Sequence, residues 1–116
     1  MAWAGLNQRQ FPRVNTRCDI LIHHRLGGAI QACTQNLGIG GACVILKQEL
    51  EKLSTVRLRL TLKSEAAPIA CEGRIVWIVR SKEPSSGKVT FDTGIEFLNL
   101  KLDEQERITS FIQDKV

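Results

Sequence analysis

The strongest structural signal in this sequence is an alternation of apolar and polar residues between positions 56 and 63. Val56, Leu58, Leu60 and Leu62 alternate with Arg57, Arg59, Thr61 and Lys63. Successive side chains of a strand point to opposite faces, so this period of two predicts a strand with one buried and one solvated face. No aromatic residue lies between the basic ones. We therefore interpret the basic face as solvated surface and expect no single-stranded nucleic-acid site there.

Other runs of β-branched and apolar residues are bounded by Gly, Pro, Asn and Ser, which are typical of turns. They predict five further strands at 14–24, 29–34, 42–46, 69–79 and 89–98. The polar segment 47–54, with Leu50 and Leu53 as its apolar residues, predicts one short helical turn.

The end of the chain carries a helical pattern. Ile108, Phe111 and Ile112 recur at the spacing of one helix face. Asp103, followed three residues later by Glu106, resembles a capping box at the helix start. These residues predict a single amphipathic helix that closes the chain.

Six short strands followed by one helix predict a mainly β fold. The expected architecture is a small antiparallel barrel or sandwich whose open end or side the helix covers. We divide the chain into a flexible N-terminal arm at 1–13, a β-barrel at 14–100 and a C-terminal helix at 101–116. Strands and helices do not alternate, so a doubly wound nucleotide-binding fold is not expected.

Composition places this chain among ordinary globular domains. It has 116 residues, of which 43% are hydrophobic and 24% charged, a size and balance suited to one domain. No apolar run is long enough to cross a bilayer and no signal peptide is evident, so we expect a cytoplasmic protein without membrane insertion. In that compartment Cys18, Cys33, Cys43 and Cys71 are expected to be thiols, and their spacing predicts no metal site.

The sequence shows no motif of an enzyme. It has no catalytic Ser/His/Asp order and no paired carboxylates in a motif. Cys18 and His23 form the one dyad worth weighing, but a core cysteine beside an exposed strand histidine accounts for them more simply. We therefore expect a non-catalytic protein.

Two local patterns suggest an anion-binding site. Arg9 and Arg13 lie four residues apart on the N-terminal arm, and arginine makes bidentate bonds to phosphate oxygens and to the O6/N7 edge of guanine. Asn36, Gly38 and Gly41 lie in a predicted loop, where glycine permits positive φ and close approach of a ligand. Taken separately, the arginines can also simply solubilise a terminus, and the glycines can simply form a hairpin turn.

Together, these patterns resemble the PilZ domain family over essentially the whole chain. Arg9 and Arg13 match its R-x-x-x-R motif, while Asn36, Gly38 and Gly41 match [D/N]-x-[S/A]-x-x-G with Gly38 where Ser is usual. The late strand ending Gly-Ile-Glu-Phe at 94–97 is also similar to the family's close. The resemblance implies a six-stranded antiparallel β-barrel that binds the bacterial second messenger cyclic di-GMP, without any cofactor.

The resemblance also implies roles for individual residues. Arg9 and Arg13 would contact phosphate and guanine, and Asn36 would read a guanine Watson–Crick edge. Trp77 would stack on a base or, alternatively, lie in the core or on the barrel face. Loss of the Ser hydroxyl at Gly38 is expected to weaken affinity.

The implied function is that of a stand-alone receptor. Ordering of the N-terminal arm on binding would signal to an unidentified downstream protein in motility, pilus, biofilm or exopolysaccharide control. The alternative is a PilZ-like protein-interaction module that does not bind cyclic di-GMP.

Overall fold

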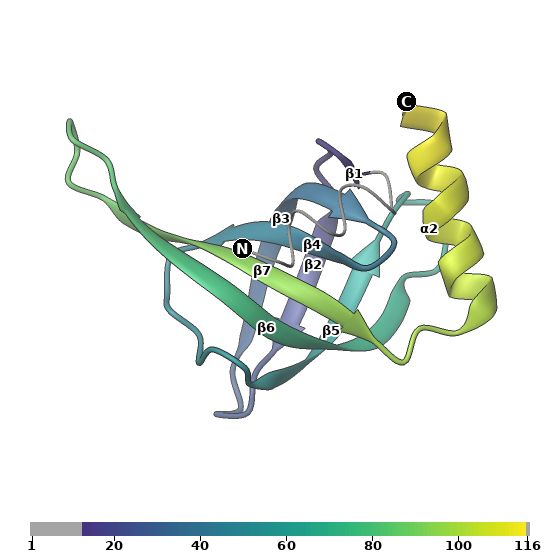
Figure 1. Cartoon of the computed structure of the whole chain (residues 1–116), viewed down its shortest axis with the longest axis horizontal. Coiled ribbons are helices and arrows are strands. Elements are labelled where there is room, and N and C mark those ends of the chain that lie inside the picture. Colours follow the sequence, from purple (N-terminus) through teal and green to yellow (C-terminus); the bar gives the residue numbers. More distant parts are fainter. Residues whose placement is uncertain (1–12, 116) are drawn as a thin grey trace.

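The computed structural model describes residues 13–115, whose arrangement is shown in Figure 1. In chain order, the elements are β1 (Arg13–Val14), β2 (Asp19–His23), β3 (Ala29–Gly38), β4 (Gly41–Leu46), β5 (Thr55–Thr61), β6 (Ile69–Lys82), β7 (Val89–Leu98) and α2 (Leu102–Lys115). Within these residues, no helix has both the length and the apolar character needed to cross a membrane.

The strands form one closed antiparallel sheet. Their order is β1-β3-β2-β5-β6-β7-β4, and pairing between β3 and β4 closes the ring. Six strands therefore make a barrel, while β1 is an extra strand that pairs with β3. The predicted six-stranded antiparallel barrel with a C-terminal helix is confirmed.

The alternation seen in the sequence places β5 in the barrel wall. Its apolar residues Val56, Leu58 and Leu60 are at most 2% exposed, whereas its arginines are exposed. Leu60 lies opposite Ile20 of β2 and Ile69 of β6, both fully buried. Full burial of such side chains contributes roughly 1.5–3 kcal/mol each, so this register holds the barrel interior together.

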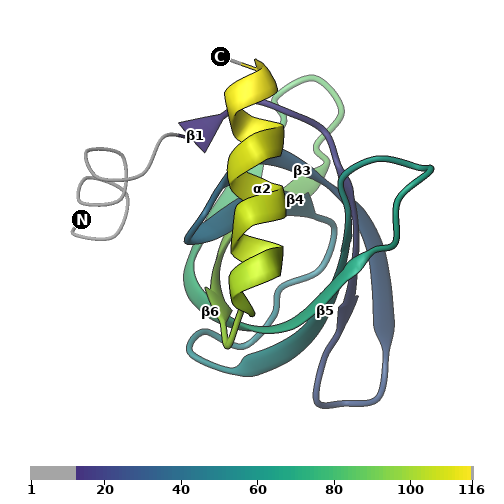
Figure 2. The same ribbon diagram turned by 90° about the vertical axis from the view of Figure 1, so that its right-hand side faces the viewer.

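The helix α2 lies across one end of the barrel, as Figure 2 shows. Its buried residues are Ile108, Phe111 and Ile112, the three that were predicted to form the apolar face. The predicted capping box at Asp103 and Glu106 is wrong.

The helix begins at Leu102, two residues earlier than that capping box requires. The Lys101 N–H donates to Oε1 of Glu104 at 3.0 Å, and the Gln105 N–H donates to the Lys101 carbonyl at 2.9 Å. Glu104 therefore satisfies one of the backbone donors that a helix start leaves open.

The predicted helical turn at 47–54 is also wrong: the segment ends in a turn in which the Ser54 N–H donates to the Glu51 carbonyl at 3.2 Å, and it bonds to β6 as well. The Leu53 N–H donates to the Ile75 carbonyl at 2.7 Å, and the Ile75 N–H donates to the Ser54 carbonyl at 3.0 Å. Leu53 has a φ of 69°, in the left-handed region that a helix excludes. Backbone bonds to a neighbouring strand thus override the local pattern.

The hairpin of β6 and β7 is longer than predicted and projects from the barrel (Figure 1). Pairing continues to Lys82 opposite Val89, beyond the predicted strand end at position 79. The Glu83 N–H donates to the Lys88 carbonyl at 2.8 Å and so closes the loop.

Replacement of Ile108 tests whether α2 is a structural cap. Ile108→Ala removes a fully buried side chain, and we expect the free energy of unfolding to fall by about 2–5 kcal/mol. Leu102, in the same helix, is 73% exposed, and Leu102→Ala should change it by less than about 0.5 kcal/mol. Urea denaturation measures both, and equal losses would show that the helix face is not packed as described.

Candidate functional site

A β-bulge in β3 determines where Asn36 points. Thr34 pairs with Val44 and Asn36 with Cys43, so Gln35 is an extra residue without a partner in β4. Thr34 is buried in the barrel, and strict alternation would direct Asn36 inward as well. The bulge reverses the phase and places Asn36 on the outer face.

Arg13 joins Asn36 on that face. In β1, Arg13 pairs with Gly38, two residues beyond Asn36 on the same side of β3. Nη2 of Arg13 donates to Oδ1 of Asn36 at 2.7 Å. The register thereby brings together one residue from each sequence motif. Arg9 lies outside the described residues.

The glycine segment is a tighter hairpin than predicted. β3 runs to Gly38 and β4 starts at Gly41, so the connection consists of Ile39 and Gly40. Among the described residues, the glycines with positive φ are Gly27 and Gly87. Gly38 and Gly41 do not use the freedom of positive φ that glycine permits, and their relevant property is the lack of a side chain.

A second bulge, in β6, places Trp77 on the same face. Ile75 pairs with Ile95 and Trp77 with Gly94, which leaves Val76 as the extra residue. A Cβ on Gly94 would overlap Cε2 and Nε1 of the Trp77 ring. Trp77 thus lies over Gly94 on the outer face of the barrel and not in its core.

The strand register arranges this face in two neighbouring rows. One row crosses β3, β4, β7 and β6 through Asn36, Cys43, Gly94 and Trp77. The other crosses β1, β3, β4, β7 and β6 through Arg13, Gly38, Gly41, Glu96 and Arg74. Nη1 of Arg74 lies 3.9 Å from Oε1 of Glu96. Sequence patterns alone missed Arg74, Glu96 and Cys43, which are found only once the strands are paired.

Burial shapes the electrostatics around Arg13. It lowers the pKa of the Arg13 guanidinium, and the nearby Cys43 thiol acts in the opposite direction. Burial raises the pKa of Cys43, and the Asp92 carboxylate raises it further. Arg13 therefore faces an uncharged thiol at neutral pH, and this thiol does not neutralise its charge.

The other thiols do not suggest covalent catalysis. Burial raises the pKa of the Cys18 thiol. It is also the main cause that raises the pKa of the Cys71 thiol to about 11. A nucleophilic cysteine needs a lowered pKa, so the proposed dyad of Cys18 and His23 gains no support. Within residues 13–115, no group of three or more His, Cys, Asp or Glu side chains is placed to hold a metal ion.

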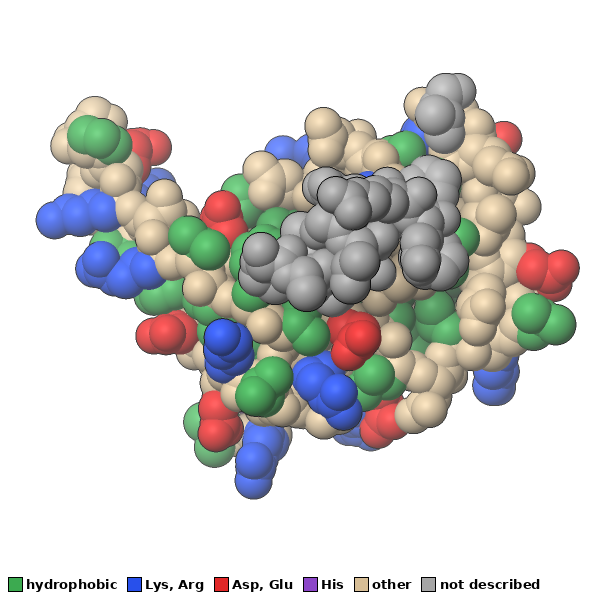
Figure 3. All heavy atoms as spheres, viewed as in Figure 1, with side chains coloured by type: hydrophobic (Ala, Val, Ile, Leu, Met, Phe, Trp, Pro, Cys, Tyr) green, Lys and Arg blue, Asp and Glu red, His purple; other side chains and the backbone are tan. Residues whose placement is uncertain are grey.

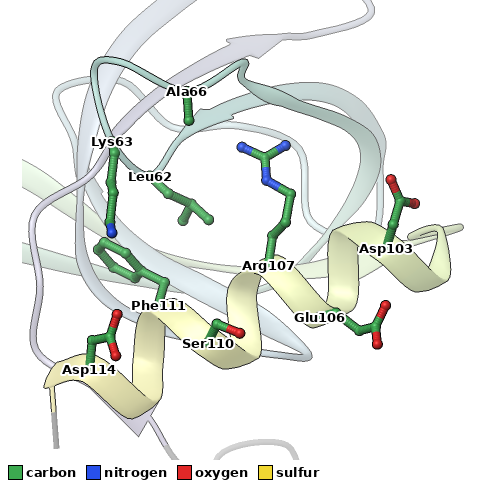
Figure 4. Close-up of a pocket in the computed structure, with 9 residues that line it drawn as sticks. All are labelled: Leu62, Lys63, Ala66, Asp103, Glu106, Arg107, Ser110, Phe111 and Asp114. Carbon is green, nitrogen blue, oxygen red and sulfur yellow. The ribbon is translucent and has the colours of Figure 1, made fainter.

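A groove between α2 and the β5–β6 loop is a poor competitor for an anionic ligand (Figure 4). Its Arg107 donates through Nη2 to the Ala67 carbonyl, which uses one of the donors of that guanidinium. Asp103, Glu106 and Asp114 line the same groove and would repel a phosphate.

Positive and negative side chains are mixed on the side of the molecule drawn in Figure 3. On the side drawn in Figure 3, and apart from its grey atoms, Lys and Arg side chains are interspersed with Asp and Glu. Nucleic-acid-binding faces usually present a basic stripe, and the coloured part of this side does not show one.

Comparison with known proteins agrees with this fold. The sequence model of the PilZ domain matches residues 7–114. The chain belongs to the PilZ domain family. No curated protein sequence was found to match it.

Solved PilZ structures share the architecture at low sequence identity. The E. coli YcgR PilZ domain with c-di-GMP has 13% identity and a TM-score of 0.74, with 92% of this chain and 90% of that one covered. MotI of Bacillus subtilis has 21% identity and a TM-score of 0.76, with coverage of 92% and 50%. The K. pneumoniae MrkH–c-di-GMP complex has 19% identity and a TM-score of 0.72, with coverage of 92% and 51%. This chain thus spans about half of MotI and MrkH.

Replacement of Gly94 tests the packing of Trp77 in this PilZ domain. Gly94→Ala forces the indole ring to move, and we expect a loss of about 1–3 kcal/mol in the free energy of unfolding. In a Trp77→Ala background the same change should cost much less, because the overlapping ring is gone. Urea denaturation of the four proteins gives this coupling. An unchanged cost without Trp77 would contradict the described contact.

Proposed function

We propose that this PilZ domain binds cyclic di-GMP on the outer barrel face that carries Arg13 and Asn36. The observation that carries the proposal is the 2.7 Å hydrogen bond between these two residues, which joins the two motifs at one place. Cyclic di-GMP offers two phosphates and two guanines. The Arg13 guanidinium suits either phosphate oxygens or guanine O6 and N7.

The remaining motif residues complete the proposed site. Arg9 is assigned by its motif alone. Gly38 and Gly41 lie in the same row as Arg13 and carry no side chains, and Trp77 supplies an aromatic ring for base stacking. PilZ structures of YcgR and MrkH that hold c-di-GMP have the same fold, which supports this choice of ligand.

The signalling step would involve the N-terminal segment. Arg13 is held by β1, so a ligand that contacts both Arg9 and Arg13 would fix the segment between them relative to β1. Charge-assisted bonds would offset the conformational entropy lost in that segment. The rearranged surface would then contact a downstream protein, which the chemistry of the site does not identify.

Isothermal titration calorimetry tests the binding proposal. Arg13→Ala removes a charge-assisted contact, so we expect its affinity for cyclic di-GMP to fall by at least about ten-fold. Arg59→Ala is the matched control, because it removes the same charge from the exposed face of β5, and its affinity should equal that of wild type. If wild type gives no heat with micromolar ligand, the domain is instead a non-binding interaction module.

Amide NMR tests the location of the site. Cyclic di-GMP should shift the signals of residues 9–13 and 36–41 and the indole signal of Trp77, because these groups would surround the ligand. Signals of Arg57 and Arg59 should not move, since they lie on the outer face of β5. Shifts centred on β5 would contradict the proposed site.

A further inference from the structure

The side chains of the two motifs offer more hydrogen-bond donors than acceptors. Arginine side chains only donate, and the Asn36 carbonyl already accepts from Arg13. Asn36 therefore retains one lone pair of Oδ1 for a ligand, together with its Nδ2 hydrogens, which suit O6, N7 or phosphate oxygen. The Watson–Crick edge of guanine presents N1–H and N2–H, which are donors themselves. While it is bonded to Arg13, Asn36 can accept at most one of these two hydrogens, so recognition of the whole edge requires a further acceptor on the face.

Glu96 is placed to provide that acceptor. It lies opposite Gly41 in the row that begins at Arg13, with Gly38 and Gly41 between them. Neighbouring strands are about 4.8 Å apart, so two glycine positions leave a floor about 10 Å wide without side chains. The Glu96 side chain is 39% exposed and can turn toward a ligand on that floor.

Trp77 lies beside this carboxylate. Its ring covers Gly94, which is two residues from Glu96 on the same face of β7. A guanine stacked on the ring could thus direct its edge along β7 toward Glu96. A carboxylate has two acceptor oxygens and can take both N1–H and N2–H.

We propose that Glu96 determines base specificity by accepting the N1–H and N2–H of a bound guanine. This inference rests on the proposed binding of cyclic di-GMP. The Arg74 contact does not oppose it: at 3.9 Å and with both side chains partly exposed, such a pair contributes little to stability and leaves the carboxylate free to reorient.

Asp92 is the other carboxylate on this side of β7, but its position is less suitable. It lies opposite Ile45 of β4 and Val79 of β6, on the far side of Gly94 from the row that contains Arg13. Both neighbours are exposed apolar residues rather than motif residues.

The test uses two ligands that differ by one amino group on each base. Cyclic di-IMP contains hypoxanthine, which lacks the N2 amino group of guanine and is otherwise identical. Calorimetry with both ligands should show that wild type prefers cyclic di-GMP by about ten-fold, the contribution of a hydrogen bond to a charged acceptor. In Glu96→Gln this preference should fall to about two-fold or less, with weaker binding of cyclic di-GMP.

Three matched variants test whether the effect is specific to Glu96. Glu72→Gln makes the same change on neighbouring β6, where Glu72 accepts from Asn99 at 2.8 Å, and should keep the preference. Asp92→Asn should also keep it. Arg74→Gln removes the ion-pair partner and should keep it too, because Glu96 itself would contact the base. Thermal unfolding of each variant checks that the barrel is intact.

The outcomes separate the inference from the proposed function. If folded Glu96→Gln retains the ten-fold preference, or Arg74→Gln loses it to the same extent, Glu96 does not read the base. That result leaves cyclic di-GMP binding itself intact when wild type binds and Arg13→Ala does not. Absence of binding by wild type overturns both.

Discussion

The candidate site depends on two breaks in strand alternation. At Gln35 in β3 and at Val76 in β6, one extra residue reverses which face the following side chains occupy. Upstream of each bulge, Thr34 and Ile75 point into the barrel, while Asn36 and Trp77 beyond them point outward. Without these bulges, an amide and an indole would be directed into an apolar core, where unsatisfied polar groups are costly. The same bulges thus protect the core and equip the surface.

Strand β3 connects this local geometry to closure of the barrel. Its first half pairs with β2, and its second half pairs with β4 and β1. Thr34, beside the bulge, donates through Oγ1 to the Thr16 carbonyl at 2.7 Å and accepts from the Cys18 N–H at 2.9 Å. These bonds hold the β1–β2 connection against β3. The position of Arg13 relative to Asn36 is therefore set by the buried polar contacts of Thr34 as well as by two pairs of β-bridge partners.

Much of the fold could be predicted because local pattern and tertiary structure agree in β5 and α2. The alternation of Leu58 and Leu60 with arginines, and the helical spacing around Ile108, both reflect one buried face. The segment 47–54 could not be predicted in this way, because Leu53 and Ser54 bond to Ile75, which lies more than twenty residues away. Nearby sequence carries no information about such a partner.

The same limit applies to the candidate site. Motif spacing pointed to Arg13 and Asn36 but not to the bond between them. Glu96 could not be singled out because its relevance comes from lying opposite Gly41, which only strand register shows. A bulge is also invisible to alternation, since alternation assumes a constant phase.

The bond between Arg13 and Asn36 gives the proposed receptor a defined resting state. β1 contains only two residues, so its ladder alone is a weak anchor, and the side-chain bond adds a third connection to β3. A phosphate competing for the Arg13 guanidinium would exchange a bond to a neutral amide for one between opposite charges, which is the stronger kind. Ligand binding and rearrangement of the β1 tether would then be a single equilibrium, because both depend on the same hydrogen-bond donor.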